Sequence, residues 1–194
     1  MKKFLLICFI LIQASIATCQ AEFIVTVQQI LSDVVATGTG SINTGALSST
    51  GGGVFSPYVD ANRGQIGVGS PTNIAGKSGS FTGPSNFGTG DIFLADIGTG
   101  DPVSIGSSGF LSLPSLYSSE SPLSGSATWT NKTFTDLGLT QGEYTWTWGS
   151  GPNADFFKLK IVAASAPEPA TLPLFITAML AQFGIRRFRL KRKA

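Results

Sequence analysis

Histidine is absent from the 194 residues, cysteine occurs twice, and charged side chains make up only 12% of the chain. Without histidine the chain lacks the commonest general base and metal ligand. Ser-His-Asp and Cys-His nucleophilic sites, and zinc sites that use histidine, are therefore excluded. Both cysteines, Cys8 and Cys19, fall in the first twenty residues. From this composition we expect no enzyme, no cofactor and no catalytic residue.

The first 21 residues have the order of a secretory signal peptide. Met1-Lys2-Lys3 is a positive start, residues 4–12 are an unbroken apolar run, and small and polar residues follow as far as Ala21. We expect cleavage after Ala21, which leaves a mature chain without cysteine, so that its core is stable without disulfides. Acylation of Cys19 is an alternative, because residues 16–19 are similar to a lipobox.

Residues 164–194 carry three features in a fixed order. Pro167, Glu168 and Pro169 come first, and an apolar stretch over residues 170–185 follows. The chain then ends on six cations, which are Arg186, Arg187, Arg189, Lys191, Arg192 and Lys193. Sixteen residues of helix span about 24 Å, short of the roughly 30 Å hydrocarbon core of a bilayer. The pattern predicts a short transmembrane helix that anchors the precursor, with its basic end in the cytoplasm.

This order resembles the PEP-CTERM sorting signal of Gram-negative bacteria, over the last 28 residues of the chain. The resemblance implies that an exosortase-type membrane protease recognises Pro167, Glu168 and Pro169 and removes the tail during export. It further implies export through the inner membrane and a final place at the cell surface, the outer membrane or the extracellular matrix. Residues 126–151 are also similar to the end of many small PEP-CTERM proteins, and this likeness implies no biochemical site.

The charge of the chain is divided between its segments. Residues 22–166 hold five basic and ten acidic side chains, a net charge of −5, although the whole chain is formally +2. Removal of both terminal segments would leave an acidic domain without a basic patch. Nucleic acid is therefore not an expected partner.

Residues 22–163 predict an all-β domain, an antiparallel β-sandwich or jelly roll. The expected strands cover residues 22–30, 32–42, 54–59, 65–68, 91–97, 103–105, 110–113, 127–130, 144–148 and 156–162. Period two places Tyr144, Trp146 and Trp148 on one face of their strand, and residues 149–153 predict a hairpin connection to the next strand. An unstructured Gly/Ser/Thr coat is the competing interpretation, and outside the expected strands it applies best to residues 44–53 and 104–126.

Two residue sets have a binding interpretation beside a structural one. The first set consists of four aromatic residues, Trp129, Tyr144, Trp146 and Trp148. These residues would form a platform for sugar rings if they are exposed, and they would belong to the hydrophobic core if they are buried. The sequence Gly-Thr-Gly-Asp at residues 88–91 recurs at residues 98–101. Together with Asp96, the repeated Asp91 and Asp101 would suit calcium; two turns flanking one strand would give the same spacing.

The expected function is that of an exported, non-enzymatic surface or extracellular-matrix protein associated with exopolysaccharide. Its mechanism would be the presentation of a polar, Thr/Ser-rich β surface to glycans or to neighbouring copies. The alternative is a carbohydrate-binding module that uses an exposed aromatic face.

Overall fold

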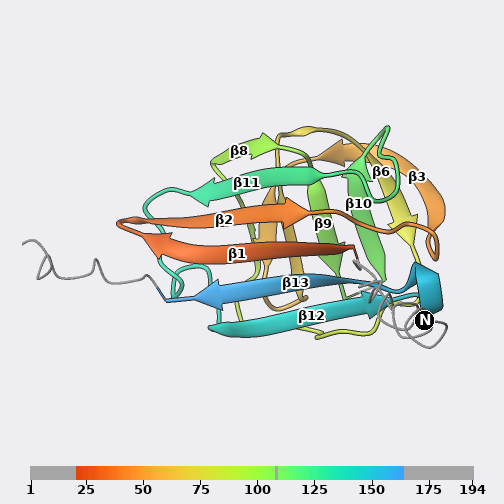
Figure 1. The fold of residues 1–194 in the computed structure, drawn as a ribbon. Helices are drawn as coiled ribbons and strands as arrows, with labels where there is room; N and C mark the ends of the chain where they lie inside the picture. Colours follow the sequence, from red (N-terminus) through yellow and green to blue (C-terminus); the bar gives the residue numbers. More distant parts are fainter. Residues whose placement is uncertain (1–20, 108, 164–194) are drawn as a thin grey trace, which may run out of the picture. The chain divides into compact units, whose positions relative to one another are not determined.

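In the computed structural model, which describes residues 21–107 and 109–163, the first sheet has six strands (Figure 1). Their order is β12 (Gly142–Trp148), β13 (Asp155–Val162), β1 (Glu22–Ile30), β2 (Asp33–Gly40), β11 (Leu123–Trp129) and β8 (Ile97–Gly100). All neighbours are antiparallel except β1 and β13, which run parallel. The first and the last strand of the domain therefore lie side by side within this sheet.

The second sheet has seven strands and is antiparallel throughout. Their order is β3 (Ser48–Phe55), β6 (Thr72–Ser78), β10 (Phe110–Pro114), β9 (Val103–Gly106), β5 (Gln65–Val68), β4 (Tyr58–Asp60) and β7 (Ile92–Leu94). Its strands run behind those of the first sheet and cross them steeply (Figure 1). A single 3-10 turn, η1 (Gly151–Asn153), joins β12 to β13.

The core lies between the sheets, because alternate residues of each strand face inward. In β1 these residues are Phe23, Val25 and Val27, all of which are buried. An aromatic cluster fills the region under β12 and β13, where the Trp146 ring meets the Phe157 ring edge-on at 5.8 Å. Among the described residues, the core extends along the chain from Phe23 to Ile161.

The all-β sandwich expected from the sequence is confirmed, and several details of the expectation are wrong. Residues 54–59 are divided between β3 and β4, which are not neighbours in their sheet, and β6 was not expected. Residues 44–53 and 104–126 are not loose throughout, since β3, β10 and most of β11 lie in them. Residues 91–97 are not one strand, because β7 and β8 belong to different sheets. The signal peptide over residues 1–20 and the helix expected in residues 164–194 lie outside the described residues. Within the described part, no helix has the length and apolar character to cross a membrane.

Tyr117 holds together two connections between the sheets. Residues 41–47 carry the chain from β2 to β3, and residues 115–122 carry it from β10 to β11. The Tyr117 hydroxyl accepts a hydrogen bond from the backbone N–H of Ile42 at 2.8 Å. It also lies 3.0 Å from the Ile42 carbonyl oxygen and 2.9 Å from that of Ser121. One side chain therefore serves the polar backbone groups of both connections.

Replacement of Tyr117 by phenylalanine should lower the free energy of unfolding of residues 22–163 by about 1–3 kcal/mol, because the buried Ile42 N–H loses its acceptor. Urea titration followed by tryptophan fluorescence measures this loss. Tyr144→Phe is the matched control, since its hydroxyl donates only to the Thr140 carbonyl at an exposed position. Equal losses in the two variants would contradict the role given to Tyr117.

Candidate functional site

The outward side of the six-stranded sheet carries a row of hydroxyl groups. Thr26, Thr37, Ser126 and Thr99 come from β1, β2, β11 and β8, and each is paired in register with the next. Inward-facing apolar residues alternate with these polar ones, so period two sends the hydroxyls to the solvent side. We call these four residues the hydroxyl row.

An ion pair continues the hydroxyl row across the remaining two strands. Lys160 of β13 is the register partner of Thr26, and Glu143 of β12 is the partner of Lys160. The Lys160 ammonium lies 3.6 Å from the Glu143 carboxylate, at an exposed position where such a pair adds little stability. A line of polar side chains therefore crosses all six strands.

The row can exchange hydrogen bonds with a polar partner along its whole length. The Thr99 and Ser126 hydroxyl oxygens are 2.8 Å apart, and either of them can be the donor. The Thr26 and Thr37 side chains make no hydrogen bond to any described residue, so their hydroxyls can still donate and accept. Thr39 and Ser124, which are exposed and paired with each other, extend the same surface towards one end of the sheet.

The aromatic residues singled out in the sequence do not form an exposed platform. Trp129, Trp146 and Trp148 are 2%, 0% and 3% exposed, and Tyr144 is partly buried against the core. The Trp129 indole donates to the Phe93 carbonyl, and the Trp148 indole donates to the Asn43 carbonyl. The Trp146 indole N–H has no hydrogen-bond partner among the described residues. The platform interpretation is therefore wrong for the three tryptophans.

Two of the three carboxylates proposed for calcium, Asp96 and Asp101, accept hydrogen bonds from neighbouring protein groups. Asp96 accepts from the N–H and the hydroxyl of Thr130, and these two bonds lower its pKa. Asp101 accepts from the Ser124 N–H at 2.9 Å. No group of three acidic or cysteine side chains suited to a metal exists among residues 21–107 and 109–163, so Asp91, Asp96 and Asp101 are not brought together.

The most perturbed carboxyl group of the described chain lies where β12, β13 and both sheet connections meet. Asp155 is 3% exposed and accepts hydrogen bonds from the backbone N–H groups of Asn43 at 2.6 Å and Phe156 at 2.7 Å. Asn43 in turn donates from its side chain to Glu120 at 2.8 Å. We call Asn43, Tyr117, Glu120, Trp148 and Asp155 the crossover node. Sequence reasoning did not single it out as a site.

Burial raises the pKa of Asp155 to about 6. The hydrogen bonds from Asn43 and Phe156 oppose this rise, and the nearby charges of Glu120 and Glu22 add to it. Perturbed carboxyl groups occur at catalytic sites and also in structural networks. Here both hydrogen bonds to the carboxylate come from the backbone, which assigns Asp155 a structural role.

Of the remaining site residues expected from the sequence, one lies in the described part of the chain and the others lie outside it. Ala21, the expected cleavage position, immediately precedes β1. The sorting residues Pro167, Glu168 and Pro169 lie outside the described residues, as do the basic residues from Arg186 to Lys193. The hydroxyl row was not identified from the sequence. Three of its strands are rich in Thr and Ser and alternate polar with apolar residues, but only the strand pairing shows that the four hydroxyl groups are aligned.

Because folded Asp155 binds its proton more tightly than the unfolded chain does, raising the pH from about 4 to 7 should cost the folded state about 2–3 kcal/mol. Asp155→Asn removes this titration. The wild-type free energy of unfolding minus that of the variant should therefore fall over this range, as measured by urea titration at each pH. A difference that stays constant or rises with pH would contradict the raised pKa.

Comparison with known proteins adds no relative. No family model, no curated protein and no solved structure matches this chain. The hydroxyl row and the crossover node are therefore interpreted from their own geometry.

Proposed function

We propose that this chain is an exported, non-enzymatic structural protein of a Gram-negative cell surface or extracellular matrix, and that its six-stranded sheet contacts exopolysaccharide. The observation that carries the proposal is the hydroxyl row, in which Thr26, Thr37, Ser126 and Thr99 are aligned across four neighbouring strands. Sugar chains are lined with hydroxyl groups, which pair readily with such donors and acceptors.

The two ends of the chain support the route by which the domain reaches that place. In this proposal residues 1–21 are a signal peptide and residues 164–194 are a PEP-CTERM-like sorting signal. The apolar residues 170–185 form a short transmembrane helix that holds the precursor in the inner membrane until an exosortase-type protease acts near Pro167-Glu168-Pro169.

The net charge of the domain limits the kinds of polysaccharide that it can bind. The domain carries ten acidic and five basic side chains over residues 22–166, so a strongly acidic glycan would be repelled overall. The hydroxyl row itself is uncharged, and the nearest cation, Lys160, is paired with Glu143. A neutral or weakly charged exopolysaccharide suits this surface best.

The alternative function, a carbohydrate-binding module with an exposed aromatic face, draws no support from the four aromatic residues on which it was based. Three of them are core residues, and Tyr144 packs against the core beside Phe87 at a ring distance of 5.7 Å. The polar sheet face is therefore the better candidate.

Intact mass spectrometry of the protein from membrane, matrix and medium fractions of its host tests the proposed route. A chain that starts at Glu22 and ends near Pro167 is expected in the matrix or medium. Absence of this form when the exosortase gene is deleted would tie the cut to that protease. A chain that still ends at Ala194 in every fraction would refute the sorting step.

Removal of hydroxyls from the row tests the proposed contact. The double variant Thr37→Val, Ser126→Ala should weaken binding of residues 22–163 to host exopolysaccharide about tenfold, since each lost hydrogen bond contributes about 0.5–1.5 kcal/mol. Affinity electrophoresis in gels that contain the polysaccharide measures this change. Thr72→Val, Ser48→Ala is the control, because both positions are exposed in the other sheet. Equal binding by all three proteins would exclude the hydroxyl row as the contact surface.

A further inference from the structure

Strand β3 (Ser48–Phe55) is an edge strand with a bare backbone. It pairs with β6 on one side only, and the ladder is regular from Gly51 to Phe55 after a register shift between Ser49 and Gly51. No hydrogen bond from any other described segment reaches its backbone. Its sequence, SSTGGGVF, contains no charged residue and no proline. Every second residue of such an edge directs an unpaired N–H and C=O outward.

The other sheet edges are covered or short. The edge of β12 is bridged by Thr82, which exchanges two backbone hydrogen bonds with Thr147, at 2.9 and 2.8 Å. At β8, the Ser70 N–H donates to the Gly100 carbonyl at 3.0 Å. Strand β7 is only three residues long. Natural proteins protect edges with charges, proline or covering segments, because a bare edge pairs with another chain. Strand β3 has a β-bulge near its start, but from Gly51 to Phe55 it carries no charge and no proline, and no described segment covers it.

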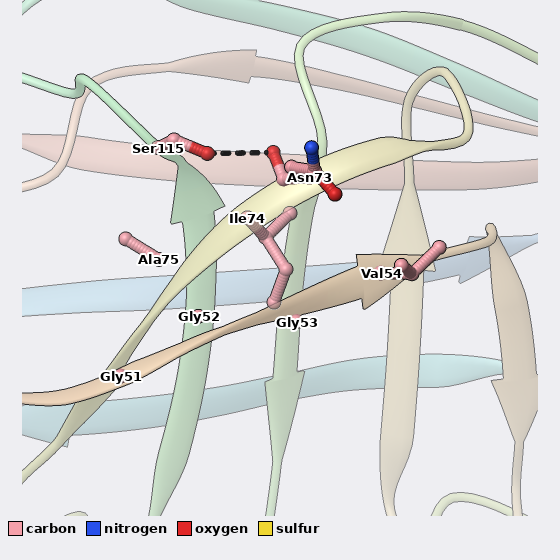
Figure 2. A pocket seen from close by; sticks show the side chains of 8 residues that line it. All are labelled: Gly51, Gly52, Gly53, Val54, Asn73, Ile74, Ala75 and Ser115. Atoms are coloured by element: carbon pink, nitrogen blue, oxygen red, sulfur yellow. Dashed lines mark hydrogen bonds between the residues drawn. The ribbon is translucent and has the colours of Figure 1, made fainter.

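The surface of β3 has a hollow and a projection next to each other. An open groove lies over the paired strands β3 and β6, and it is lined by Gly51, Gly52, Gly53, Val54, Asn73, Ile74, Ala75 and Ser115 (Figure 2). A Cβ atom built on Gly53 would meet no atom within 4 Å. Val54, which immediately follows, is 84% exposed. Within residues 21–107 and 109–163, little covers this apolar side chain.

We propose that β3 is a homotypic interface, where two copies of this chain join antiparallel through their β3 edges and form one continuous sheet. A two-fold axis near the glycines would place Val54 of each copy over the glycine groove of the other. Hollow and projection belong to the same strand, which is the requirement of an isologous interface. The absence of charge on β3 matters here, because a charged edge residue would bring two like charges close to each other at the two-fold axis of two acidic domains.

The contact is small compared with that of an obligate dimer. Strand pairing over five residues, with one valine on each side, suits an association that becomes populated when copies are concentrated at a surface. This proposal does not depend on the hydroxyl row, since β3 lies at the edge of the other sheet. A pair joined in this way would still present two hydroxyl rows.

Cysteine cross-linking in the full chain tests the interface, because its only cysteines, Cys8 and Cys19, can be replaced by serine. In this background Gly53→Cys is treated with a short bis-maleimide in membrane and matrix fractions. About tenfold more cross-linked dimer is expected than with Thr145→Cys, an exposed position on the β12 edge that Thr82 covers. Val54→Cys serves as a second reporter should Gly53→Cys fail to accumulate.

A charged residue placed on the β3 edge should disrupt the proposed dimer, and the same charge placed elsewhere is the matched control. Val54→Lys, added to Gly53→Cys, should reduce the cross-linked dimer to the level of the Thr145→Cys control. Leu116→Lys adds the same charge at a 96% exposed position outside the strands and should leave the dimer unchanged. The proposal is overturned by a dimer that survives Val54→Lys, by equal cross-linking at Thr145→Cys, or by reaction of both β3 reporters with another protein only.

Discussion

The hydrogen bond from the Asn43 N–H to the Asp155 carboxylate secures the place where the chain leaves one sheet for the other. A sandwich without disulfides between its sheets depends on such contacts. Burial of apolar side chains stabilises the core, but it does not determine the paths of the segments that connect the two sheets. Trp148 donates to the Asn43 carbonyl and Tyr117 binds the preceding Ile42, so the node engages both connections and the β12–β13 corner. The raised pKa of Asp155 is the electrostatic cost of this arrangement.

With this end of the sandwich secured, the two outer surfaces are free for different tasks. The six-stranded sheet presents aligned hydroxyls, and the seven-stranded sheet ends in the uncharged edge of β3. The core between them contains the three tryptophans together with Phe23, Phe87 and Phe157. The proposed matrix role would use polar contacts through this broad face and would require no enclosed active site.

Local patterns were sufficient to predict the two-sheet class and several strands. In β12, alternation correctly put Trp146 and Trp148 on one buried face, because period two is a local property of a strand. The break between β7 and β8 was missed, since apolar residues continue through it. There the Ala95 N–H binds Pro57 on one sheet and the Asp96 N–H binds Thr128 on the other, so the chain changes sheets within one peptide. The hydroxyl row and the Asn43–Asp155 bond join residues far apart in sequence, which periodicity does not detect.

The parallel pairing of β1 with β13 has a consequence for the order in which the domain can fold. Because β13 lies between β12 and β1, the six-stranded sheet is interrupted until the last strand of the domain has been delivered. Such long-range closure slows folding compared with a sheet that is built from local hairpins. A chain that ends before Asp155 would leave β1 and β12 without the strand that joins them. Loss of the last strand of the domain would therefore divide the first sheet, although most of its residues would still be present.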